Sequence, residues 1–147
     1  MDIKKIIEII KSEKPNVKTV YYVGCGASQA ELYPAKYFLE ANAKQLRVAI
    51  YTANEFNYAT PKALNEEAIV VTCSLGGTTP ETVAASKLAM EKGAAVIAIT
   101  NNADSPLAKA CHHLIVHNWE PNYSDKMDKM TKALLTAVEI LNQYEGF

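Results

Sequence analysis

Residues 68–81, AIVVTCSLGGTTPE, hold the features that decide the fold. The first six residues are apolar or β-branched with almost no polar alternation, which is typical of a strand buried on both faces of a parallel sheet. Gly76 and Gly77 then turn the chain, and Pro80 is a residue type favoured at the first position of a helix. A buried strand, a glycine turn and a helix in this order predict one unit of an open α/β sheet.

Predicted strands and helices alternate in the same way before and after this unit in the sequence. This alternation predicts an α/β fold in which a five-stranded parallel sheet is flanked by helices on both faces, as a three-layer sandwich. Further strands are expected at residues 17–23, 45–52, 94–100 and 114–117. Helices are expected at residues 3–14, from the turn at 24–28 to about 42, and at 61–64, 80–92, 106–110 and 127–144. Pro34 falls inside the second helix, so we expect a kink or a late helix start there.

Length and composition exclude several classes of protein. The 147 residues suit a single domain, and the net charge of −1 argues against a nucleic-acid-binding face. Arg47 is the only arginine, so an anion site must be built mainly from other groups. Three cysteines without a close pair, no signal sequence and no apolar run as long as a membrane span predict a cytoplasmic chain without membrane contact.

Two glycine turns are the expected ligand sites, because open α/β folds bind ligands outside the carboxyl ends of their strands. The turn at 74–79 carries hydroxyls on Ser74, Thr78 and Thr79, and it opens a helix. A helix N-terminus attracts anions through its free N–H groups and its dipole, so this turn predicts a phosphate site. No Gly-Lys-Ser/Thr sequence follows, which excludes a Walker A loop. The alternative is a tight turn with an ordinary cap, made by Thr79 or by Thr78 with Glu81.

The other turn, GCGAS at residues 24–28, contains Gly-x-Gly but lacks the rest of a dinucleotide fingerprint. Ala30 stands at the third glycine position, and no acidic residue ends the second strand where a ribose would need one. NAD is therefore disfavoured. We expect Ser28 to add a second hydroxyl to the ligand of the 74–79 turn, with Gly26 beside it.

Four short motifs together resemble those of the SIS (sugar isomerase) domain family. In chain order they are residues 24–28 (GCGAS), 54–56 (NEF), 74–82 (SLGGTTPET) and 104–108 (DSPLA). Their order and spacing are specific in combination, and the similarity covers about residues 17–142. The resemblance implies a five-stranded parallel sheet that binds a phosphorylated sugar.

The resemblance also implies roles for particular residues. In the family a Ser-x-Ser-Gly-x-Thr turn holds the phosphate, which gives this role to Ser74, Gly77 and Thr79. Gly76 stands in place of the second serine and Leu75 in place of a common Gln or His, so two side-chain donors are missing. Binding is then expected to depend more on backbone N–H groups. The remaining residues of the implied phosphosugar site are Gly26, Ser28 and Thr78.

The catalytic groups are expected to come mainly from elsewhere. The chain resembles fructosamine 6-phosphate deglycases and the isomerase half of glutamine–fructose-6-phosphate aminotransferase, in which a second SIS domain supplies the acid-base Glu and His. We therefore expect one SIS domain of a two-domain protein, or a homo-oligomer. Glu55 and Glu120 are the acid-base candidates within this chain, with a structural role as the alternative for Glu55. Tyr123 and Ser124 lie in a predicted loop that matches the segment lining the sugar pocket.

The implied function is that of a cofactor-independent isomerase or deglycase acting on a ketose or fructosamine 6-phosphate. The alternative is a ligand-sensing SIS module of a sugar-responsive regulator without catalysis. A purely structural domain would leave the hydroxyls of the 74–79 turn unexplained. A metal site is not expected, because His112 and His113 would point to opposite faces of a strand.

Overall fold

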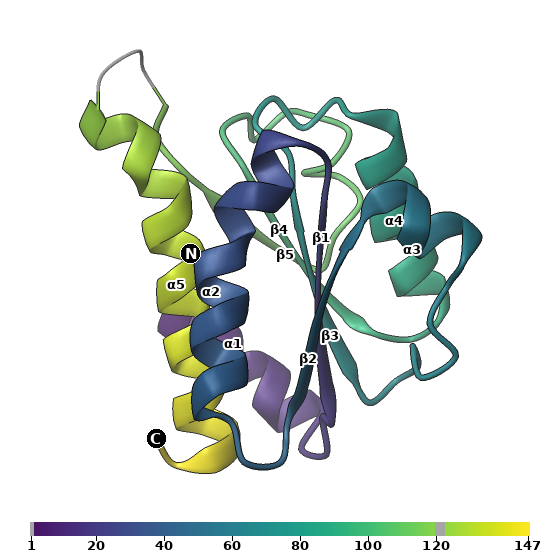
Figure 1. Ribbon diagram of the computed structural model, residues 1–147, viewed down its shortest axis with the longest axis vertical. Coiled ribbons are helices and arrows are strands. Elements are labelled where there is room, and N and C mark those ends of the chain that lie inside the picture. The colour runs from purple at the N-terminus through teal and green to yellow at the C-terminus, as the bar shows by residue number, and fades with distance from the viewer. Residues whose placement is uncertain (1, 120–122) are drawn as a thin grey trace.

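The structure, a computed structural model, describes residues 2–119 and 123–147 and, for residues 123–126, the backbone alone. Five parallel strands form one sheet in the order β2-β1-β3-β4-β5 (Figure 1). In chain order the strands are β1 (Thr19–Gly24), β2 (Arg47–Thr52), β3 (Ala68–Cys73), β4 (Ala95–Thr100) and β5 (His113–Val116). The predicted five-stranded parallel sheet is confirmed.

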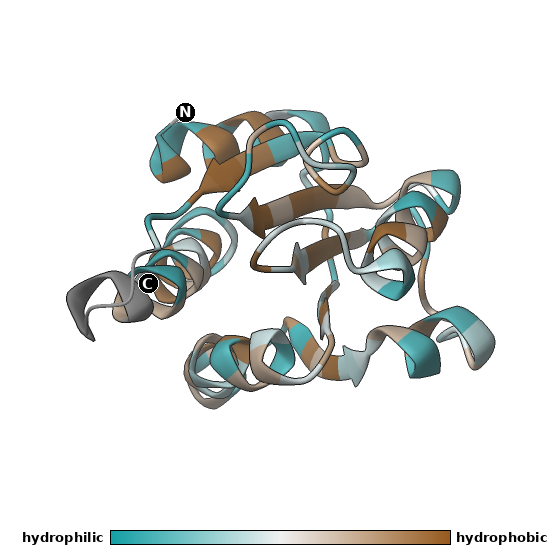
Figure 2. Cartoon of the chain, turned by 90° about the horizontal axis from the view of Figure 1, so that it is seen from above, coloured by the Kyte–Doolittle hydropathy of each residue, from teal (hydrophilic) through white to brown (hydrophobic). Residues whose placement is uncertain are grey.

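Helices cover both faces of the sheet, so the molecule has three layers (Figure 1). One face carries α1 (Ile3–Glu13), α2 (Ala27–Asn42) and α5 (Tyr123–Glu145), and the other carries α3 (Ala53–Tyr58) and α4 (Pro80–Glu91). Figure 2 shows the hydrophobic strands enclosed between the helices. None of the helices in the described residues is both long enough and apolar enough to cross a membrane.

Successive side chains of β1 point to opposite faces of the sheet, so this strand contributes to both apolar layers. Val20 and Tyr22 pack beneath α1, α2 and α5, whereas Tyr21 and Val23 pack beneath α3 and α4. Every residue of β1, β3 and β4 is buried, which explains why these strands read as continuous apolar runs rather than as alternating ones.

Two short helical segments differ from expectation. The helix expected at 61–64 lies earlier, as α3, because Thr52 and Glu55 form a capping box that starts a helix directly after β2. Residues 106–110 form successive turns instead of a helix, with hydrogen bonds from the N–H of Lys109 to the carbonyl of Pro106 and from Ala110 to Leu107.

The two longest helices each differ from expectation in one respect. α2 starts at Ala27 and continues through Pro34, so the late start is not found. Proline lacks the N–H that would bond the carbonyl of Ala30, and Ala30 is exposed, so water can satisfy that carbonyl. α5 begins at Tyr123, so the loop expected to reach residue 126 ends sooner.

Candidate functional site

The two glycine turns lie side by side at the point where the strand order reverses. From β1 the chain moves to β2 on one side, and it returns to β3 on the other. Gly24 at the end of β1 pairs in register with Cys73 at the end of β3. The 24–28 turn and the 74–79 turn therefore leave neighbouring strands at the switch point, where open α/β sheets bind their ligands.

The 74–79 turn is held by a hydroxyl pair at its base. Ser74 is only 3% exposed, and its Oγ lies 2.9 Å from Oγ1 of Thr79. Thr79 is the N-cap of α4 by position, but its side chain makes no capping hydrogen bond because it faces Ser74. The position of the N-cap at Thr79 is therefore as predicted, whereas no side-chain capping bond, from Thr79 or from Thr78 with Glu81, forms within the described residues.

Gly77 sets the path of this turn. Its φ is +71°, and a Cβ at this position would stand 2.0 Å from Oγ of Ser105. Its carbonyl accepts a hydrogen bond from the N–H of Leu107, which joins the turn to the DSPLA segment. The neighbouring Gly76 is exposed, with its nearest potential Cβ contact 3.7 Å away at Thr78 Oγ1.

The backbone of this turn presents free donors. Within the part of the chain that the structure describes, no group accepts a hydrogen bond from the N–H groups of residues 76–79. These donors lie at the start of α4, a helix of 12 residues whose dipole adds a partial positive charge. Such an array of N–H groups can bind an anion without arginine.

The 24–28 turn brings Ser28 to the same edge of the sheet. Gly26 is exposed, with a φ of 55°, and is the N-cap of α2. Ser28 is half-buried, and its Oγ lies 3.4 Å from Nζ of Lys129. Next to it, burial raises the pKa of the Cys73 thiol to about 12, so that cysteine is a neutral core residue.

Lys129 is a residue that the sequence reasoning missed. Its Nζ lies 3.3 Å from Oε1 of Glu31, and the residue is only 3% exposed. The signal was present in the spacing, because Lys129 precedes Ala133 and Ala137 by four and eight residues and so falls on the buried stripe of α5. Lysine on such a stripe is uncommon unless it is paired.

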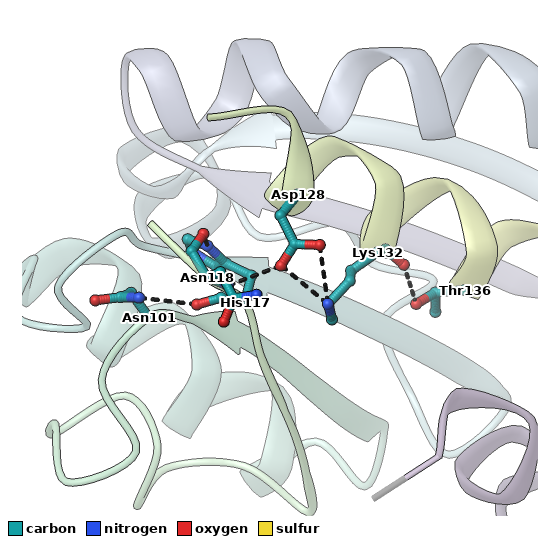
Figure 3. Close-up of polar contacts among 6 residues, drawn as sticks. All are labelled: Asn101, His117, Asn118, Asp128, Lys132 and Thr136. Atoms are coloured by element: carbon teal, nitrogen blue, oxygen red, sulfur yellow. Dashed lines mark hydrogen bonds and ion pairs between the residues drawn. The ribbon is translucent and has the colours of Figure 1, made fainter. Parts of the chain in front are cut away.

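A second polar cluster joins β4 and β5 to α5 (Figure 3). Asn101 Nδ2 donates to the carbonyl of His117 at 2.8 Å, and the N–H of Asn118 donates to Asp128 Oδ2 at 2.7 Å. Lys132 donates to both carboxylate oxygens of Asp128 at 2.9 Å. Burial acts to raise the pKa of Asp128, but the hydrogen bonds from Lys132 and Asn118 outweigh it and hold that pKa below its usual value.

His117 is fully buried within this cluster. Its Nδ1 lies 2.9 Å from the carbonyl of Asn118, which can only accept, so Nδ1 carries the proton. Among the described residues, Nε2 has no hydrogen-bond partner. Burial lowers the pKa of His117, and nearby Lys129 adds to this effect although the Asn118 carbonyl opposes it. The net effect favours the neutral imidazole over the charged one.

The predicted acid-base candidates and sugar loop have different places. Glu55 is exposed at the end of β2, and its carboxylate accepts from the N–H of Thr52 at 2.9 Å in the capping box, in agreement with a structural role. Glu120 lies outside the described residues. Tyr123 and Ser124 start α5, and their side chains likewise lie outside what the structure describes. The described residues contain no group of three or more His, Cys, Asp or Glu that could hold a metal ion.

Comparison with known proteins finds a matching family and several relatives. Residues 15–144 match the SIS domain model. The chain is 41% identical over 100 residues to fructosamine deglycase FrlB of Bacillus subtilis, an alignment covering 68% of this chain and 30% of that protein. It is 31% identical over 139 residues to the isomerizing glutamine–fructose-6-phosphate aminotransferase of Clostridium tetani, covering 94% of this chain and 22% of that enzyme.

Solved structures share the fold. A candidate phosphosugar isomerase from Salmonella typhimurium superposes with a TM-score of 0.92 at 41% identity, covering 99% of this chain and 44% of that one. The sugar isomerase domain of an RpiR transcription factor from Sphaerobacter thermophilus gives a TM-score of 0.73 at 23% identity, covering 97% and 80%, and shows likeness of fold alone. The chain spans less than half the length of the deglycase, the aminotransferase and the Salmonella protein. With the family model matching nearly all of its residues, this chain belongs to the SIS domain family.

Proposed function

We propose that this chain is the phosphosugar-binding domain of a cofactor-independent isomerase or deglycase that acts on a ketose or fructosamine 6-phosphate. The observation that carries the proposal is the 74–79 turn, where backbone N–H groups without an acceptor among the described residues meet a helix N-terminus beside the Ser74–Thr79 hydroxyl pair. The names of the relatives support a phosphorylated fructose derivative as the ligand.

In this proposal the chain binds and orients the substrate. The turn holds the dianionic ester through peptide dipoles, and Ser28 on the adjacent turn contacts the phosphate or the sugar. Fixing the phosphate places the carbons at the other end of the sugar at a constant distance from the site, which lowers the entropic cost of the reaction. A second SIS domain or a second copy of the chain supplies the acid and base that move the proton between C1 and C2.

Thermal unfolding with fructose 6-phosphate tests the proposal. A ligand that binds only the folded state raises the melting temperature as its concentration exceeds Kd. The shift is expected for the wild type and not for Ser74→Ala/Thr79→Val. The control variant is Ser12→Ala/Thr131→Val, which removes the same two kinds of hydroxyl from exposed helix positions and should keep the shift. A shift that persists in the Ser74/Thr79 variant would place the ligand elsewhere.

Ligand sensing without catalysis remains the second candidate, and one observation favours it. Among the described residues the acid-base candidate Glu55 is held in a capping box, which supports an anion site without a free general base in that part of the chain. A chain that binds fructose 6-phosphate and lacks turnover even with its natural partner domain would favour this role.

A further inference from the structure

Lys129 lies on the buried stripe of α5, a position that stability alone does not explain. Lys129 packs between α5 and α2 at 3% exposure, in line with buried alanines one and two turns later. Replacing a buried ion pair by apolar side chains is often neutral or stabilising, so the Lys129–Glu31 pair is weak grounds for a purely structural role. The position of Lys129 indicates a role at the candidate site, because its other partner is Ser28 of that site.

The chemistry of the contact fixes the direction of the hydrogen bond. An ammonium group only donates, so Lys129 Nζ is the donor and Ser28 Oγ the acceptor at 3.4 Å. The single hydroxyl proton of Ser28 is then directed away from Lys129. The Ser28 hydroxyl also lies beside the thiol of Cys73, the residue that directly precedes Ser74. Ser28 is thereby held at the base of the 74–79 turn, with its proton on the side away from the ammonium group.

We propose that Lys129 is a positioning residue for the phosphosugar site: it holds the Ser28 hydroxyl as a hydrogen-bond donor toward the bound ligand. This inference rests on the proposed function. Lys129 is too deeply buried to face a ligand directly, and its Nζ already contacts both Ser28 and Glu31. Glu31 is more exposed than Lys129, with 28% of its side chain accessible, and it balances the buried positive charge.

A double-mutant cycle distinguishes an effect through Ser28 from a direct one. The dissociation constant of fructose 6-phosphate would be measured by calorimetry for the wild type, Lys129→Met, Ser28→Ala and the double variant. Each single change is expected to weaken binding about three- to tenfold, as for the loss of one hydrogen bond. The double variant should bind no more weakly than Ser28→Ala, because the lysine acts only through the hydroxyl.

Two further variants control for charge and for folding. Lys36→Met removes a lysine of α2 that pairs with Glu40 at 3.0 Å, away from the turns, and should leave the affinity unchanged. Lys129→Met leaves the Glu31 carboxylate without its cation, so Lys129→Met/Glu31→Gln removes the pair as a unit. This variant should fold and still bind fructose 6-phosphate more weakly than the wild type.

The outcomes separate this inference from the proposed function. A wild type that does not bind fructose 6-phosphate would overturn both. A wild type that binds, with Lys129→Met/Glu31→Gln binding equally well, would overturn the inference alone. A further loss when Lys129→Met is added to Ser28→Ala would also overturn it, because the lysine would then act on the ligand independently of the hydroxyl.

Discussion

Gly76 and Gly77 are neighbours in the 74–79 turn, yet their surroundings differ completely. A side chain at Gly77 would enter the space filled by Ser105, at a φ that only glycine adopts easily. At Gly76, which has no positive φ, there is room for one. The space matters for the family pattern, because the serine that stands at this position in the motif would fit here without a change of backbone.

This contrast predicts different costs for the same substitution. Gly77→Ala should lower the free energy of unfolding by about 2–4 kcal/mol, because a strained φ and a close contact with Ser105 add together. Gly76→Ala, the matched control, should change it by less than about 0.5 kcal/mol. Urea unfolding followed by circular dichroism measures both. Equal stability of the two variants would contradict the geometry of the turn.

At the scale of elements, the sequence predicts the strands, whose apolar runs follow from burial. It does not predict the short segments whose structure depends on local hydrogen bonds. β1, β3 and β4 were predicted because strands buried on both faces leave continuous apolar runs in the sequence. The sequence does not predict the position of α3, because this helix starts at the capping box of Thr52 and Glu55. Pro61, further along the chain, is also a residue type that favours a helix start. At residues 106–110 the sequence predicts a short helix, whereas the structure has successive turns held by local hydrogen bonds.

The candidate site likewise has one part that the sequence predicts and one part that it does not. Its two turns could be located from glycines, hydroxyls and the strand order, since they are local features of the sequence. The contact of Lys129 with Ser28 joins residues 101 positions apart, so it depends on how α5 packs against α2. The spacing of Lys129 from Ala133 and Ala137 is a signal for its burial, but no sequence spacing can indicate its partner.

The end of α5 is fixed to the loop between α2 and β2 by one carboxylate. Glu145 accepts hydrogen bonds from the N–H groups of Lys44, Gln45 and Leu46 at 2.6, 3.0 and 2.9 Å. Burial acts to raise the pKa of Glu145, but these three donors outweigh it, so the pKa lies below its usual value. The contact therefore stabilises the ionised form.

Glu145→Gln should lower the free energy of unfolding by about 1–2 kcal/mol at pH 7. Because the folded-state pKa is depressed, the stabilisation is complete above the unfolded pKa of about 4.3 and disappears as the pH falls through the folded value. The difference between wild type and variant should therefore shrink below about pH 4. Glu139→Gln is the control, since among the described residues Glu139 accepts only from Asn142 of its own helix. A difference independent of pH would contradict this account.

At the scale of the whole molecule, the proposed function separates binding from proton transfer. The switch point between β1 and β3 gathers N–H donors and hydroxyls, whereas Glu55 and His117, two described residues of a type that can move a proton, are occupied or enclosed. Glu55 is engaged in its capping box, and His117 is fully buried. This agrees with the proposal that the chain holds the substrate for a base carried by another domain or copy.

The isolated chain, verified as a monomer by light scattering, should accordingly bind fructose 6-phosphate with little or no exchange of its C1 protons in D2O. Proton NMR of the sugar measures this directly, and the thermal shift in the same sample shows that the site is occupied. Binding without exchange means that the phosphate anchor acts independently of the acid-base step. Robust exchange by the monomer would instead place the base within these 147 residues. Glu55→Gln, which keeps an acceptor for the cap, and Glu120→Gln would then identify which carboxylate removes the proton.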